Sequence, residues 1–94
     1  MVHFLHEIEA MIALPDDCYI IKTSEFTGRY DVKGRKVWKH KSDKHPYYLV
    51  WDELHGEIEV FHLTSCIHLA VYHPNGDIKD EGNPNRILKF RGGK

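Results

Sequence analysis

The densest group of ionisable residues lies at residues 51–59, in the sequence WDELHGEIE. Asp52 and His55 are three residues apart, so the carboxylate can hold one imidazole nitrogen and leave the other for proton transfer. Glu59 supplies a second acid/base group, and Glu57 adds a carboxylate at an alternating position. Together these residues indicate general acid–base chemistry.

Cleavage of RNA without a metal ion needs this set of groups and one cation. A base removes the 2′-hydroxyl proton, an acid protonates the leaving 5′-oxygen, and a cation stabilises the charge on phosphorus. Arg86 is the candidate cation, because a guanidinium can fork onto phosphate oxygens. On an ideal strand His55 and Glu59 would have Cα atoms about 13 Å apart, and Gly56 could shorten this by a bulge or turn. An acidic strand edge with one histidine is also common as a plain solvated face.

The elements that must position these groups are mostly strands. Alternating or β-branched patterns predict strands at residues 47–51, 57–63, 67–72 and 86–90, with a turn at 74–77. In the first half we expect an amphipathic helix at residues 3–13, ended by Pro15, a strand at 18–23, and turns at 27–28 and 33–34. The strand spacing favours an antiparallel meander. The predicted fold class is α+β, a strongly twisted antiparallel β-sheet with an N-terminal α-helix packed on one face.

The alternation also assigns the two faces of this sheet. Toward the helix we expect the apolar side chains of Ile58, Val60, Ile67, Leu69 and Val71. The other face would carry Glu57, Glu59, His68 and Tyr72. Because folding does not require such a polar face, we expect the functional site there.

Length and charge limit the alternatives. A chain of 94 residues has room for one core, so residues 1–94 are expected to form a single domain, and no apolar run is long enough to span a membrane. The net charge of −1 argues against a general nucleic-acid binder. Residues 28–46 nevertheless hold seven cationic and two acidic residues, a net +5. The predicted RNA-binding residues are Lys33, Arg35, Lys36, Trp38, Lys39, Lys41 and Lys44, with Lys79 added.

Two other interpretations stay open at this point. Zinc could be held by His62, Cys66, His68 and His73, but their spacing fits no standard finger, so no metal or cofactor is predicted. A non-catalytic RNA- or ribosome-binding module could use Trp38, Tyr47, Tyr48 and Trp51 to stack bases, although such aromatics are more often core. Cys18 and Cys66 are too few for a disulfide scaffold, and whether they pair is left open.

The stretches LVWDELHGEIEVF and IHLAVYHPNGDIKDEGNPNRILKF resemble the cytotoxic ribonuclease domain of the ribosome-inactivating E-group colicins and cloacin. The shared pattern is W-D-x-x-H-G-E-[LI]-E, then H-L about nine residues on, then P-x-R-x-[IL] near the end. It covers roughly residues 47–90, and residues 1–27 do not match. The family fold is a strongly twisted antiparallel sheet with an N-terminal helix.

The resemblance implies a metal-independent endoribonuclease toxin that cleaves small-subunit ribosomal RNA at the decoding centre. Glu59 would be the general base, His55 the general acid, Asp52 the group that holds His55, and Arg86 the phosphate cation. Glu57 and His68 would be supporting residues. The products would be a 2′,3′-cyclic phosphate and a 5′-hydroxyl.

This chain departs from the family in charge and at two positions. Family domains are strongly basic, Phe61 stands where the family has a tyrosine, and His62 stands where a basic residue is expected. These differences bear on the ribosomal target more than on the chemistry. We expect a cytoplasmic toxin of a toxin–antitoxin pair, or the detached tip of a larger toxin. Its partners would be the ribosome and a small cognate antitoxin or immunity protein.

Overall fold

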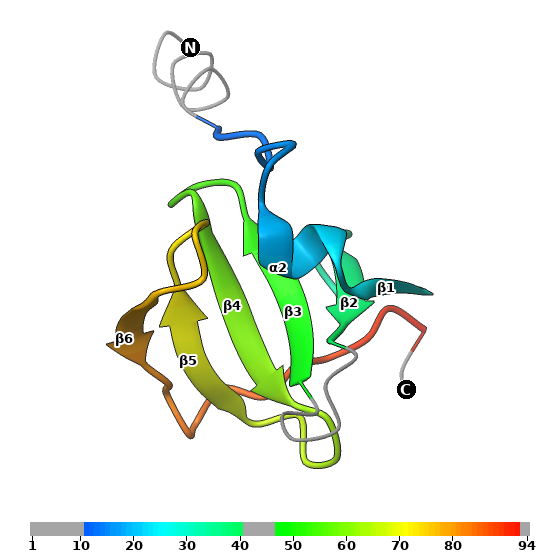
Figure 1. The fold of residues 1–94 in the computed structure, drawn as a ribbon. Coiled ribbons are helices and arrows are strands. Elements are labelled where there is room, and N and C mark those ends of the chain that lie inside the picture. Colours follow the sequence, from blue (N-terminus) through cyan, green and yellow to red (C-terminus); the bar gives the residue numbers. More distant parts are fainter. Residues whose placement is uncertain (1–10, 41–46, 93–94) are drawn as a thin grey trace, which may run out of the picture.

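The computed structural model describes residues 11–40 and 47–92, which form one antiparallel sheet with a single helical turn (Figure 1). The strands are β1 (Glu25–Tyr30), β2 (Lys36–Lys39), β3 (Tyr47–Asp52), β4 (Glu57–His62), β5 (His68–Tyr72) and β6 (Ile78–Glu81). Their order in the sheet is their order in the chain, and every neighbouring pair is antiparallel. The predicted antiparallel meander is therefore confirmed. Within the described part of the chain, no helix is long and apolar enough to cross a membrane.

The predicted N-terminal helix is the main error in the expected fold. Residues 3–10 of that helix lie outside the described residues, and residues 11–13 are not helical. The backbone N–H of Ile12 donates to the carbonyl of Glu53 at 2.7 Å, and its carbonyl accepts from the indole N–H of Trp51 at 2.8 Å. Because these main-chain groups bond to the β3–β4 hairpin, residues 11–13 cannot also make helical bonds. Among the described residues, Tyr19–Lys22 is the only helix, so the expected fold with a packed N-terminal helix ending at residue 13 is wrong.

A four-residue helix, α2 (Tyr19–Lys22), occupies the segment that was expected to be a strand. β-Branched residues only weakly favour strands, and burial overrides that preference here. The helical turn places Cys18 and Ile21 in a core cluster with Leu49, Ile58 and Val60. This cluster lies on one face of the sheet, as Figure 1 shows for α2 in front of β3.

A second cluster lies on the opposite face, where the C-terminal segment crosses the sheet. Leu88 and Phe90 pack there against Val37, Val50 and Phe61. We call residues 82–92 the C-terminal strap. The strap forms isolated bridges with both sides of the sheet, Ile67 with Ile87 and Asp31 with Phe90. It is not the continuous strand predicted at residues 86–90, because each bridge joins a different part of the fold.

The structure also corrects several predictions of local structure. Gly28 is not in a turn but inside β1, at a φ of 78° within a register irregularity of the β1–β2 pair. Gly34 does lie in the turn between β1 and β2, at a φ of 82°. Strands β1, β2 and β6 were not predicted, since their sequences are polar and lack a clear alternation.

Candidate functional site

The β3–β4 hairpin positions Asp52 and His55. Asp52 pairs with Glu57 across the hairpin, and the backbone N–H of Gly56 donates to the carbonyl of Asp52 at 2.8 Å. Gly56 adopts a φ of 63°, which glycine reaches without strain, so the chain turns between His55 and β4. His55 is consequently in a turn and not on an extended strand.

The Asp52 carboxylate both closes this turn and orients the imidazole. Its Oδ1 accepts from the backbone N–H of Leu54 at 3.0 Å, while Oδ2 lies 2.8 Å from Nδ1 of His55. That contact leaves Nε2 of His55 available, on a side chain that is 66% exposed. A proton on Nε2 can therefore be exchanged with a ligand.

The contact between Asp52 and His55 shifts the pKa of both residues. The hydrogen bond and the charge of Asp52 raise the pKa of His55 above its ordinary value. Partial burial acts to raise the pKa of Asp52, but the hydrogen bonds from His55 and Leu54 and the charge of His55 outweigh it, so that pKa is lowered. An imidazole with a raised pKa keeps its proton to higher pH, as a general acid requires.

Glu59 lies in the middle of β4 and is 3% exposed. Its Oε2 accepts from Nη1 of Arg86 at 2.7 Å and lies 3.1 Å from Nε2 of His68. Arg86 comes from the C-terminal strap and His68 from β5, so tertiary structure brings three distant residues together. The Glu59 carboxylate, although deeply buried, therefore has a guanidinium and an imidazole as partners, as a buried polar group requires.

A bulge in β5 directs His68 toward Glu59. Val60 pairs with Ala70, but the next residue, Phe61, pairs with His68, so Leu69 is the extra residue. Without that extra residue, His68 would point to the α2 face. The predicted face of His68 is therefore correct only because of the bulge.

The strap then fixes the His68 ring. Nδ1 of His68 accepts from the backbone N–H of Asn83 at 2.8 Å, so the ring proton of the neutral imidazole sits on Nε2. Burial, together with the charge of Arg86, lowers the pKa of His68 despite the raising effect of Glu59. Nε2 makes no well-directed hydrogen bond, although Glu59 is close. His68 is thus a neutral, oriented donor beside the candidate base.

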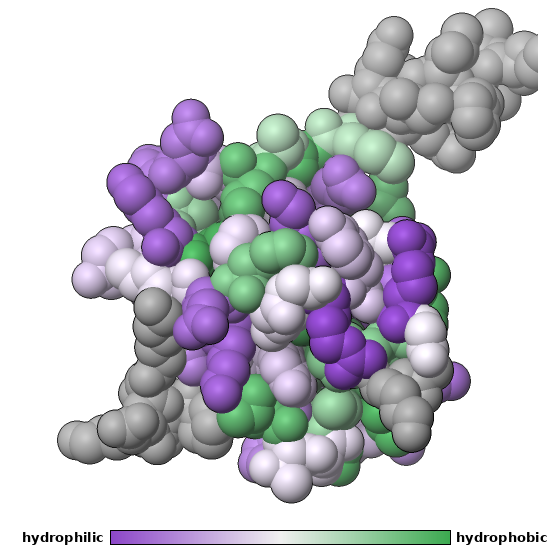
Figure 2. Space-filling view, turned by 90° about the vertical axis from the view of Figure 1, so that its right-hand side faces the viewer, coloured by the Kyte–Doolittle hydropathy of each residue, from purple (hydrophilic) through white to green (hydrophobic). Residues whose placement is uncertain are grey.

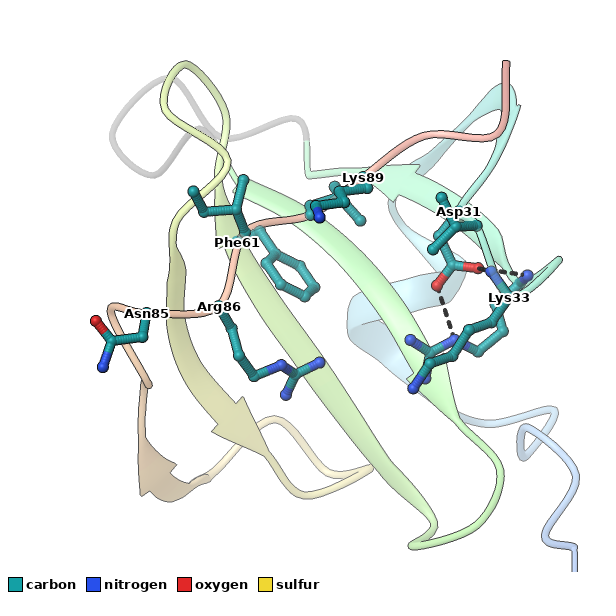
Figure 3. Close-up of a pocket in the computed structure, with 10 residues that line it drawn as sticks. Asp31, Lys33, Phe61, Asn85, Arg86 and Lys89 are labelled. Atoms are coloured by element: carbon teal, nitrogen blue, oxygen red, sulfur yellow. Dashed lines mark hydrogen bonds and ion pairs between the residues drawn. The ribbon is translucent and has the colours of Figure 1, made fainter. Parts of the chain in front are cut away.

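Arg86 connects the two halves of the site. It lines a cleft of about 340 Å³ together with Asp52, His55, Lys33 and Arg35. It also lines a neighbouring cleft of about 410 Å³, which contains Lys33, Arg35 and Lys89. Figure 3 shows Arg86 and Lys33 reaching over the sheet from opposite sides. Glu59 lines neither cleft and is in contact with Arg86, which lines both.

Arg35 has a structural role in addition to its place in the cleft. Its Nε donates to Oδ2 of Asp31 at 2.8 Å, and Oδ1 of the buried Asp31 accepts from the backbone N–H groups of Lys33 and Arg35. These bonds hold the end of the β1–β2 hairpin in place. Lys33 and Arg35 are therefore fixed opposite Arg86.

The other predicted RNA-binding residues are dispersed. Lys36 and Trp38 lie on β2 and line a further cleft, and Lys39 ends β2. Lys79 bonds to Glu57 at 2.5 Å, so its charge is matched there. Lys41 and Lys44 lie outside the described residues. Of the possible stacking aromatics, Trp51 is buried, and Tyr47 and Tyr48 pack against the two cores.

The predicted site face needs two corrections in β5. Tyr72 pairs with Ile58 and packs against the core on the α2 face, so it is not part of the site. Val71 pairs with Glu59 and shares its face, while Leu69 is 38% exposed. The bulge reverses the alternation on which the prediction rested.

Sequence reasoning also missed contributors to the site. Phe61 lies under it, with its ring centroid 5.1 Å from that of His68 and 5.8 Å from Cζ of Arg86. Gly82 has no room for a side chain, because a Cβ would lie 2.3 Å from the carbonyl oxygen of His68. The only sequence signal for Gly82 was the glycine itself.

One group in the described part of the chain could hold a metal ion. Asp52, His55 and Glu57 can each offer one ligand atom within 4.8 Å of the others. Lys79 already bonds to the Glu57 carboxylate, and Asp52 to the histidine. His62, Cys66, His68 and His73, which were weighed for zinc, do not form such a group among the described residues. Cys18 and Cys66 are free thiols, which answers the question of their pairing.

The comparisons with known proteins do not assign this site. No family model matches the chain, and a search of curated proteins finds no match either.

Proposed function

We propose that this protein is an endoribonuclease that cleaves RNA without a metal ion, by attack of a 2′-hydroxyl on the adjacent phosphodiester. The observation that carries the proposal is the contact of Arg86 with Glu59 in a site where Arg86 also lines one cleft with His55. A base, an acid and a phosphate-binding cation therefore meet in one region.

In the proposed reaction Glu59 takes the proton of the 2′-hydroxyl. The 2′-oxygen bonds to phosphorus, and the bond from phosphorus to the 5′-oxygen breaks. His55 gives its Nε2 proton to that oxygen, which leaves as a 5′-hydroxyl, and the other product is a 2′,3′-cyclic phosphate. Asp52 holds His55 through Nδ1 and stabilises its protonated form.

Arg86 has two tasks in this scheme. Only Nη1 is bonded to Glu59, and the side chain is 42% exposed, so other guanidinium N–H groups can donate to phosphate oxygens. As the phosphate draws Arg86 toward the cleft, the Glu59 carboxylate loses its contact with Nη1 and becomes accessible to the 2′-hydroxyl. His68 and Glu57 have supporting roles, since Nε2 of His68 lies 3.1 Å from Oε2 of Glu59 and Glu57 holds Lys79.

The substrate class follows from the resemblance described above and from the cations around the clefts. We propose ribosomal RNA, at the decoding centre of the small subunit, as the target. The protein would then act as a toxin in the cytoplasm, where ribosomes are found. The cell that makes it would need a small antitoxin or immunity protein.

A non-catalytic RNA-binding module is the second candidate. It is favoured by one observation, that Asp52 and Glu59 already have structural partners that explain their burial and bonds. Cleavage distinguishes the two candidates.

The test is to incubate purified protein with intact ribosomes, and separately with deproteinised ribosomal RNA, and to map new RNA ends. We expect a 5′-hydroxyl end with wild type and none with Glu59→Gln. Glu81→Gln, an exposed carboxylate on β6 that loses the same charge, is the matched control and should cleave normally. Absence of new ends with wild type on both substrates would reject the proposal, as would equal cleavage by a folded Glu59→Gln variant.

A further inference from the structure

We propose that the α2 face of the β1–β2 hairpin is a stacking platform for unpaired RNA bases, formed by Phe26, Tyr30, Trp38 and Lys36. This inference deepens the proposed ribonuclease function, because it identifies the substrate as single-stranded at the nucleotides beside the cleavage site. The platform lies outside the groups that carry the proposed chemistry.

The three rings form a continuous row. The ring centroid of Phe26 lies 5.7 Å from that of Tyr30 and 5.4 Å from that of Trp38. Phe26 and Trp38 are direct partners in the sheet, and Tyr30 pairs with Lys36. The Lys36 ammonium lies 5.5 Å from the Phe26 centroid and 6.0 Å from the Trp38 centroid. A cation therefore stands over the rings.

The row is accessible. Phe26 is 36% exposed and Tyr30 is 38% exposed, and neither belongs to one of the two core clusters, whereas Trp38 is half-buried and packs against the cluster around Leu49. Helix α2 packs on the core around Leu49, and neither Phe26 nor Tyr30 is among the residues packed against that core. Folding of the core does not explain aromatic residues at both positions of an edge strand.

Clefts connect the platform to the candidate active site. Lys36 and Trp38 line a cleft of about 410 Å³ with Arg35 and Glu53. The same Arg35 and Glu53 line the cleft that contains His55 and Arg86. Glu59 lies on the opposite face of the sheet, so a strand of RNA with its phosphate at Arg86 would pass Arg35 at the end of the β1–β2 hairpin and turn onto the α2 face to reach the rings.

The chemistry of this face fits a nucleic acid strand better than an acidic protein. Single strands are bound by aromatic rings that stack bases beside cations that contact the backbone. Here rings and cations alternate along one hairpin, with Lys33 and Arg35 at its end. Figure 2 shows the side of the molecule that was at the right of Figure 1, where strongly hydrophilic and hydrophobic side chains are interspersed. An acidic protein partner would use the cations but would not need the ring faces.

The test measures binding separately from cleavage. The probe is a labelled single-stranded DNA of about 12 nucleotides, which offers the same stacking surfaces but lacks the 2′-hydroxyl and so is not cleaved. We expect the double variant Phe26→Leu/Tyr30→Leu to bind at least about fivefold more weakly, because each lost stack is worth roughly five- to 150-fold in affinity. Tyr19→Leu, a 74% exposed aromatic on α2, is the matched control and should bind as wild type does.

A second measurement needs no variant. Trp51 is buried with its indole bonded to Ile12, so quenching of tryptophan fluorescence by the bound strand should come from Trp38. Unchanged affinity in the folded double variant, or absence of quenching at saturation, would overturn the platform. The platform would also be overturned if a DNA duplex bound as tightly as the single strand. The same holds if polyglutamate displaced the strand completely and its own binding required Phe26 and Tyr30. Strand binding without cleavage of any RNA would instead reject the ribonuclease function and leave the platform standing.

Discussion

Substitution of Gly82 by alanine tests whether the strap and the β5 bulge together orient His68. The added Cβ would lie 2.3 Å from the carbonyl oxygen of His68 and 2.4 Å from the carbonyl carbon of Leu69. Both are backbone atoms, so no side chain can move aside. To reach ordinary contact distance, of about 3.4 Å, the strap and the bulge must separate by about 1 Å.

Such a separation should have three measurable effects. Overpacking of this kind costs about 1–3 kcal/mol, which would lower the urea midpoint by on the order of 1 M. The Asn83 N–H is one residue from the substitution, so its 2.8 Å bond to Nδ1 of His68 should lengthen or break. A displacement of 1 Å near a reacting group also lowers catalytic rate by roughly 100-fold.

The assays are urea denaturation and the ¹⁵N chemical shifts of the His68 imidazole, which report which nitrogen carries the proton. Gly28→Ala is the matched control, because nothing lies within 4 Å of its added Cβ and only its φ of 78° is strained. That control should lose stability and leave the His68 shifts unchanged. If Gly82→Ala is as stable as wild type with unaltered His68 shifts, the proposed role of the bulge is refuted.

Four further predictions concern charge, pH and metal dependence. Asp52→Asn should lower the pKa of His55 toward its ordinary value and move the alkaline limit of cleavage to lower pH; an unchanged NMR titration of His55 would contradict this. Burial lowers the pKa of His68 in the folded protein, so the unfolded chain binds a proton there at a higher pH than the folded protein does. The free energy of unfolding should therefore fall as the pH drops through the ordinary pKa of histidine. His68→Gln should weaken this fall in urea titrations at pH 7 and 5, and an identical fall in both proteins would count against it. Lys33→Gln should reduce the slope of log affinity against log salt by about 0.7, and an unaltered slope would remove Lys33 from the RNA contacts. Excess EDTA should leave cleavage unchanged, whereas loss restored by zinc would indicate a metal at Asp52, His55 and Glu57.

The sequence by itself determined the β3–β4 hairpin, which carries Asp52, His55 and Glu59. Alternation from Glu57 to His62 placed Glu59 on the face opposite Ile58 and Val60, because successive side chains of a strand point to opposite faces. Gly56 marked the turn that carries His55. The local pair of Asp52 and His55 could also be predicted, since a contact between residues three apart depends only on that turn.

Only the tertiary structure decided which residues meet Glu59. Arg86 reaches it because the strap crosses the sheet, and His68 because Leu69 is an extra residue in β5. Both depend on contacts between segments far apart in the chain, and sequence periodicity does not record such contacts. The helix at Tyr19–Lys22 has the same cause, because burial of Ile21 against Leu49 and Ile58 outweighs the strand preference of its own residues.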